Sequence, residues 1–147
     1  MEEAVVLVTG ATKNSGYATA ERFAREGYRV CVTSRRPDDA ARAAPEISEA
    51  YGVQAKGYGL DLESVEDIRR VFADVKETFG RLDVFVGNSA NLGLGSSALE
   101  ITQEQFDGVM NVNTRGNFFC SQEAAKMMIP QGGGAIVLIG SVHYRGA

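Results

Sequence analysis

The residues best suited to chemistry lie in a turn near the start of the chain. Residues 9–16 read Thr-Gly-Ala-Thr-Lys-Asn-Ser-Gly, and they directly follow the apolar residues 5–8. We expect residues 5–8 to form a buried strand and residues 17–27 to form a helix. Backbone N–H groups in such a turn, together with the positive end of the helix dipole, bind the pyrophosphate of a nucleotide. An ordinary strand–helix loop can have the same composition, so the turn alone does not decide the function.

Polar or small residues also follow four further apolar runs, each where a strand should end. Residues 34–36 follow the second run, Asp61 the third, residues 87–90 the fourth and Ser141 the fifth. In an open sheet of parallel strands, ligands bind beyond the carboxyl ends of the strands, where the strand order reverses. The repeated placement therefore predicts one ligand site built from several loops.

The elements that must position these residues alternate between strand and helix. We expect strands over 5–8, 28–33, 53–60, 82–86 and 135–139, and helices over 17–27, 38–51, 64–79, 102–113 and 117–129. This order predicts an α/β fold, a doubly wound parallel sheet with helices on both faces. We expect residues 1–147 to form one domain.

Local signals predict how the helices begin and which sides they bury. Asp38 or Asp39 is expected to cap the second helix, with Gly52 at its end. The pairs Ser64 with Asp67 and Thr102 with Gln105 have the spacing of capping boxes. Helical spacing turns one stripe of the first helix toward the sheet, namely Ala18, Ala20, Phe23 and Ala24.

Composition excludes several classes of function. The chain of 147 residues is 44% hydrophobic with a net charge of −4, which is typical of a globular domain and argues against nucleic acid or an anionic membrane as partner. The apolar run after the acidic start is too short for a signal peptide or a membrane span. Cys31 and Cys120 have no metal-ligand spacing, so we expect no metal site and two reduced, buried thiols in a cytoplasmic protein.

The turn and the strand ends together resemble one protein family. Thr9-Gly10-x-x-x-Asn14-x-Gly16 is similar to the Thr-Gly-x-x-x-Gly-x-Gly signature of the short-chain dehydrogenase/reductase family, with Asn14 in place of the middle glycine. We expect that position to need a positive φ, which asparagine tolerates best among the residues other than glycine. The resemblance implies a Rossmann-type fold that binds a dinucleotide.

The resemblance also implies a cofactor site spread over several loops. Its residues are Gly10, Thr12, Lys13, Asn14, Ser15, Gly16, Ser34, Arg35, Arg36, Asp61, Leu62, Asn88, Ser89 and Ala90. By resemblance, Asp61 contacts the adenine amino group. Residues 87–90 read Gly-Asn-Ser-Ala where the family has Asn-Asn-Ala-Gly, and their small side chains let the backbone approach the nicotinamide ribose.

The residues after the second strand predict the choice of cofactor. NAD sites usually place a carboxylate there for the ribose 2′-hydroxyl, whereas NADP sites need cations for the 2′-phosphate. Residues 33–36 read Thr-Ser-Arg-Arg, with no carboxylate before Asp38. Arg35 can bind a phosphate through two hydrogen bonds, and Lys13 matches a basic position of NADP-preferring family members. The pattern favours NADP(H); the alternative is two solvated arginines on a loop.

Asn113 and Ser141 fall where the family has two catalytic residues. The resemblance implies that the Asn113 carbonyl holds a water in a proton relay and that Ser141 polarises the substrate carbonyl. In the family, a Tyr-x-x-x-Lys motif supplies the acid, but no tyrosine of this sequence has a lysine four residues later. We expect the later strands and the helix with that motif to be absent, and the chain alone to be inactive. A helix kink at Asn113 and a strand-end cap at Ser141 are the alternatives.

These features favour an oxidoreductase that transfers a hydride between NADP(H) and a small carbonyl or alcohol substrate. One alternative is a nucleotide-binding module of the same fold without hydride transfer, and another is epimerisation or elimination. The resemblance further implies a homo-oligomer, a dimer or tetramer, with the helix over 117–129 at a subunit interface. His143 is the only histidine, and we assign it no catalytic role.

Overall fold

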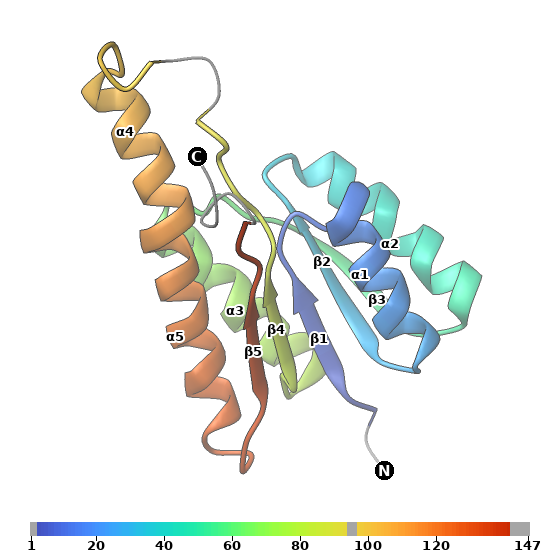
Figure 1. The fold of residues 1–147 in the computed structure, drawn as a ribbon. Coiled ribbons are helices and arrows are strands. Elements are labelled where there is room, and N and C mark those ends of the chain that lie inside the picture. The colour runs from blue at the N-terminus through green and yellow to red at the C-terminus, as the bar shows by residue number, and fades with distance from the viewer. Residues whose placement is uncertain (1–2, 94–96, 142–147) are drawn as a thin grey trace.

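Five parallel strands form the centre of the computed structural model, which describes residues 3–93 and 97–141 (Figure 1). The strands are β1 (Val5–Val8), β2 (Arg29–Ser34), β3 (Ala55–Gly59), β4 (Val84–Gly87) and β5 (Ala135–Leu138). Their order in the sheet is β3-β2-β1-β4-β5, and every neighbouring pair is parallel. The chain builds outward from β1 in both directions, so the order reverses between β1 and β4. The predicted doubly wound parallel sheet is confirmed.

Helices cover both faces of this sheet. Helices α1 (Asn14–Arg25) and α2 (Pro37–Tyr51) lie on one face, and α3 (Val65–Phe79) and α5 (Asn117–Met128) lie on the other (Figure 1). Helix α4 (Gln103–Met110) continues through a π-helix, η1 (Asn111–Gly116), into α5. Strand β1 is completely buried, and its side chains alternate between two core clusters, one beneath α3 and α5 and one beneath α1 and α2. Burial on both faces explains why β1 is uniformly apolar.

The first helix differs from its prediction. Helix α1 begins at Asn14, inside the expected turn, so that Gly16, Ala20 and Ala24 face the core, while Ala18 is exposed. Those three buried residues are four apart, which is the spacing of one helix face. The expectation for Ala18 was therefore wrong, because Ala18 lies two residues from Gly16 and from Ala20, about 200° around the helix, and so is on the opposite side.

Two predicted caps also differ. The cap of α2 is Arg36 rather than Asp38 or Asp39, since Pro37 takes the first helical position, where its missing N–H costs nothing. Ser64 accepts a hydrogen bond from the Asp67 N–H as expected, but the Asp67 carboxylate accepts the Asp61 N–H instead of closing the capping box. The capping box of Thr102 and Gln105 is complete, and Gly52 and Gly80 end their helices in the left-handed conformation.

Two further features bear on the class of protein. Cys31 and Cys120 are both unpaired and buried, as predicted. Within residues 3–93 and 97–141, the helices are too short or too polar to cross a bilayer. His143 and Tyr144 lie outside the described residues.

Candidate functional site

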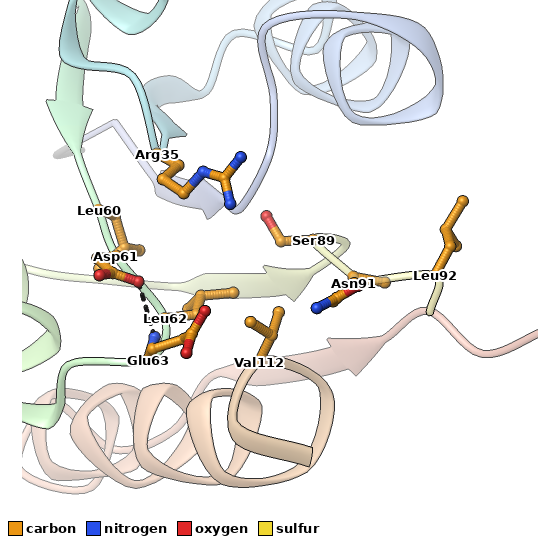
Figure 2. A pocket seen from close by; sticks show the side chains of 10 residues that line it. Arg35, Leu60, Asp61, Leu62, Glu63, Ser89, Asn91, Leu92 and Val112 are labelled. Atoms are coloured by element: carbon orange, nitrogen blue, oxygen red, sulfur yellow. Dashed lines mark hydrogen bonds between the residues drawn. The ribbon is translucent and has the colours of Figure 1, made fainter. Parts of the chain in front are cut away.

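A cavity of about 370 Å³ lies at the carboxyl ends of the strands, beside the point where the strand order reverses. Figure 2 shows Arg35 entering it from the end of β2, Asp61 from the loop after β3, and Ser89 from the loop after β4. Its lining residues are Arg35, Leu60, Asp61, Leu62, Glu63, Ser89, Ala90, Asn91, Leu92 and Val112. The structure thus brings together five of the predicted cofactor residues, namely Arg35, Asp61, Leu62, Ser89 and Ala90.

The turn after β1 has the backbone that the sequence predicted. Asn14 has a φ of 50°, and it is the only residue other than glycine with a positive φ in the described part of the chain. A Cβ placed on Gly16 would lie 2.2 Å from the Gly10 carbonyl oxygen, and one placed on Gly10 would lie 2.6 Å from Ser89 Oγ. Side chains at Gly10 and Gly16 would therefore force the turn open, away from the loop after β4.

Asn88 fastens the turn after β1 to the end of β4. Its Nδ2 donates to the carbonyl oxygens of Thr9 at 3.0 Å and Gly10 at 3.3 Å, and its Oδ1 accepts from Ser15 Oγ at 3.0 Å. The side chains of Asn88 and Ser15, both predicted to bind the cofactor, thus hold two loops together. They position the backbone of the turn, whose N–H groups remain the candidates for phosphate contact.

Thr9 is a supporting residue to which sequence reasoning gave no role. Its buried Oγ1 accepts hydrogen bonds from the N–H groups of Asn88 at 2.9 Å and Ser89 at 3.0 Å. A threonine directly after the buried apolar strand β1 was the available signal, because a buried hydroxyl needs partners.

A second cavity, of about 230 Å³, lies between the turn and helix α2. It is lined by Thr12, Lys13, Arg36, Asp39, Arg42, Ala43 and Glu46. Arg36 Nε lies 2.7 Å from Asp39 Oδ2, and Arg42 also pairs with this carboxylate. The hydrogen bond from Arg36 is the main reason that the pKa of Asp39 lies below its ordinary value. The predicted basic residues are therefore divided, with Arg35 at the larger cavity and Lys13 and Arg36 at the smaller one.

Asp61 and Leu62 form one wall of the larger cavity. Asp61 Oδ1 accepts the Glu63 N–H at 2.9 Å, the dashed contact in Figure 2. Leu62 is buried, and its carbonyl packs so closely against η1 that a Cβ on Gly116 would lie 2.5 Å from it. The exposed Asp61 carboxylate is thus held in a turn at the rim of the cavity.

Asn113 lies within the π-helix and clasps the loop after β4. Its Oδ1 accepts the Asn91 N–H at 2.7 Å, and its Nδ2 donates to the Asn91 carbonyl at 2.8 Å. The Asn113 carbonyl accepts Asn117 Nδ2 at 3.1 Å. A break in helix geometry at this position matches the kink considered from the sequence, and π-helical turns occur often at functional sites. The role of Asn113 in a proton relay stays a prediction.

Ser141 lies beyond the end of β5, and it is exposed. The Ile139 N–H donates to the Gly87 carbonyl at 2.9 Å, so the chain leaves the sheet beside the end of β4. Ser141 is therefore at the same edge of the sheet as the two cavities, although it is not among their lining residues given above. Its contact with a substrate carbonyl stays a prediction.

The profile of the short chain dehydrogenase family matches residues 4–145. The chain belongs to this family, as its signature residues and sheet topology predicted. It is 37% identical over 145 residues to the short-chain reductase protein NovJ of Streptomyces niveus, covering 99% of this chain and 55% of NovJ. The chain spans about half the length of the curated relatives that it matches.

Two solved structures illustrate the similarity. Actinorhodin polyketide ketoreductase with NADPH is 35% identical with a TM-score of 0.92, and the match covers 99% of this chain and 56% of that one. NAD⁺-bound xylitol dehydrogenase is 30% identical with a TM-score of 0.90, and the match covers 95% of this chain and 54% of that one. Proteins of this fold therefore bind both nicotinamide cofactors.

Proposed function

We propose that this chain is the NADP(H)-binding part of an oxidoreductase that transfers a hydride between NADP(H) and a small carbonyl or alcohol substrate. The observation that carries the choice of cofactor is Arg35, which lies at the end of β2 and lines the larger cavity. No carboxylate precedes Asp38 in this loop, so a ribose 2′-phosphate would meet a guanidinium rather than a negative charge. NADPH in the related ketoreductase structure supports the choice.

The residues present fit such a cofactor. Gly10 and Gly16 leave the turn free of side chains, and Asn14 starts the helix that follows. We assign the N–H groups of residues 12–16 to the pyrophosphate, Arg35 with Lys13 and Arg36 to the 2′-phosphate, and Asp61 with Leu62 to the adenine. Ser89 and Ala90 would face the nicotinamide ribose. The bound cofactor would supply or accept the hydride.

Asn113 and Ser141 are the proposed catalytic residues, Asn113 through its backbone carbonyl and Ser141 through its hydroxyl. A hydroxyl can orient a carbonyl, but reduction also requires a proton donor. Because the sequence holds no Tyr-x-x-x-Lys, we propose that the 147-residue chain alone has no dehydrogenase activity. Losing a general acid costs about 10²- to 10⁴-fold in rate.

A second candidate is a nucleotide-binding module without hydride transfer. It is favoured by residues 87–90, which lack the first asparagine and the last glycine of the family motif. An NADPH-oxidation assay with simple ketones compares the two in any longer form that carries a Tyr-x-x-x-Lys. Turnover supports the enzyme, and tight NADPH binding without turnover supports the module.

The domain organisation, compartment and oligomeric state of the chain are also proposals. We propose that residues 1–147 form one nucleotide-binding domain of a cytoplasmic homo-oligomer. Two buried, unpaired cysteines support a reducing compartment. Exposed apolar side chains on α4 and α5, namely Phe106, Met110 and Phe118, support association through these helices.

Titration of the chain with NADPH and NADH, followed by nucleotide fluorescence, tests the cofactor assignment. Since each charge-assisted hydrogen bond to the 2′-phosphate contributes about 1.5–3 kcal/mol, one or two such bonds should make NADPH bind about 10- to 1,000-fold more tightly. Arg35→Ala should lose about tenfold or more of this preference. Arg22→Ala, which removes an exposed arginine paired with Glu26 on α1, is the matched control and should keep it. Equal affinities in the parent chain, or an unchanged preference in Arg35→Ala, would contradict the assignment.

A further inference from the structure

The last residue of β4 has no side chain because a residue of α5 fills the space beside it. A Cβ placed on Gly87 would lie 2.6 Å from Asn117 Oδ1 and 2.7 Å from Leu138 Cδ2. The family motif has an asparagine at this position, where this sequence has Gly87. In this chain an amide reaches the same place from the neighbouring helix.

The amide of Asn117 is inserted into the backbone hydrogen bonding of its own helix. Asn117 Nδ2 donates to the carbonyl oxygens of Asn113 at 3.1 Å and Val112 at 3.4 Å. Both carbonyls belong to η1, and Asn117 is the first residue of α5. A side chain that bonds to carbonyls at such a junction stabilises the change from π-helical to α-helical geometry.

The π-helix held in this way controls one wall of the larger cavity. Asn113 binds both backbone groups of Asn91, and Asn91 and Val112 line the cavity. Contacts therefore run without interruption from Gly87 through Asn117 and Asn113 to Asn91. Asn91 directly follows Ser89 and Ala90, which are assigned above to the nicotinamide ribose.

The other atom of the amide shows that Asn117 does more than fill space. Asn117 Oδ1 is buried and has no hydrogen-bond partner among the described residues. A leucine could fill the same volume beside Gly87 without leaving an acceptor unpaired, which costs free energy. An asparagine at this place is explained by the donor on its other side.

We propose that Asn117 is a positioning residue for the nicotinamide end of the cofactor site. It acts through Asn113, by holding the π-helix where the Asn113 side chain can form its two hydrogen bonds with the backbone of Asn91. This inference rests on the proposed binding of NADP(H). It predicts that losing the Asn117 donor weakens contacts at the nicotinamide end of the cofactor and spares contacts at the adenine end.

Two ligands separate the two ends of the site. NADPH has both halves, whereas adenosine 2′,5′-bisphosphate has only the adenine, its ribose, and the 2′- and 5′-phosphates. In Asn117→Leu, which keeps the volume and removes both the donor and the unpaired acceptor, we expect NADPH to bind about three- to tenfold more weakly. The bisphosphate should bind as it does to the parent chain, and thermal melting should show no loss of stability. Asn117→Ala should show the same split between the two ligands.

Ser121→Ala is the matched control, because Ser121 Oγ donates to the Asn117 carbonyl at 2.7 Å on the same helix and lines neither cavity. It should change neither affinity. The inference is overturned if Asn117→Leu binds NADPH as tightly as the parent chain, or if both ligands weaken equally, as a purely structural role requires. If the parent chain binds neither ligand, the proposed function itself fails and this inference fails with it.

Discussion

Asn14 occupies a backbone conformation that few residues adopt. Its φ of 50° is in the left-handed region, at the first residue of α1. Asn14→Gly should therefore leave the free energy of unfolding nearly unchanged, whereas Asn14→Val, with a branched Cβ, should lower it by more than about 1 kcal/mol. Urea denaturation of the two variants measures the difference.

The same pair of variants tests the link between this conformation and the cofactor. A valine that pushes the turn out of shape should also weaken NADPH binding, because the N–H groups of the turn would no longer converge. Unchanged stability and affinity in Asn14→Val would contradict the prediction, because they would show that this position does not require the left-handed conformation.

For single residues, the sequence predicted conformation and position correctly where a short motif or the end of a strand determines them. Asn14 was predictable because its conformation follows from its place in a short motif. Arg35 and Asp61 could be placed because parallel strands bring their carboxyl ends to one edge. The bond of Asn88 to Thr9 could not be predicted, since it joins residues 79 positions apart. The contact of Asn117 with Gly87 likewise depends on how α5 packs on the sheet.

At the scale of elements, Asp83 joins β4 to β1 at the amino ends of the two strands. Its Oδ2 accepts the Val5 N–H at 2.8 Å, its own N–H donates to the Val5 carbonyl at 2.9 Å, and Arg81 Nη2 lies 2.6 Å from Oδ1. Burial raises the pKa of Asp83, but the hydrogen bonds from Arg81 and Val5 outweigh it, so the pKa lies below its ordinary value.

A lowered pKa in the folded state fixes the sign of the pH dependence. The stabilisation from the Asp83 carboxylate is present above the unfolded pKa of about 3.9 and is lost as the pH falls through the lower folded value. Asp83→Ala should therefore lower the free energy of unfolding by about 1–3 kcal/mol at neutral pH, and by less in acid. Urea denaturation from neutral pH to below pH 4 measures both quantities.

Asp74→Ala is the control for this prediction. Asp74 is a half-exposed carboxylate that pairs with Arg70 on the surface of α3, and its loss should change stability by less than about 0.5 kcal/mol. If Asp83→Ala behaves like this control, or if its effect does not diminish in acid, the Asp83 carboxylate does not stabilise the pairing of β1 with β4.

Helix caps were predictable where no donor from outside the helix competes for the capping side chains. The capping box of Thr102 and Gln105 is complete because both partners belong to one turn. The box of Ser64 and Asp67 fails because the Asp61 N–H, from the preceding loop, takes the Asp67 carboxylate. Propensity placed every strand, but their order in the sheet depends on how the connecting helices cross it, which no local pattern contains.

In the whole molecule, strand β5 is an exposed, apolar edge of the sheet. Within residues 3–93 and 97–141, strand β5 pairs only with β4, and the side chains of Ile136, Val137 and Leu138 are between 41% and 56% exposed. Exposed apolar edge strands associate with other chains. We expect light scattering to show association of the isolated chain, and Val137→Lys to reduce it by adding a charge at this edge.

Ala50→Lys adds the same charge at an exposed position on α2, which packs on β2 and β3 at the other end of the strand order, and should leave the association unchanged. A parent chain that is a clean monomer, or equal effects of the two lysines, would mean that the β5 edge does not drive association.

The proposed function requires that the loops at the carboxyl ends of the strands form one NADP(H) site around the point where the strand order reverses. Titrating the ¹⁵N-labelled chain with NADP⁺ and recording amide chemical shifts tests it most directly. We expect the largest shifts on residues 10–16, 34–36, 61–62 and 88–91, with little change at the amino ends of the strands, around Val5 and Asp83. No saturable shifts, or shifts centred on the amino ends of the strands, would contradict the proposed NADP(H) site.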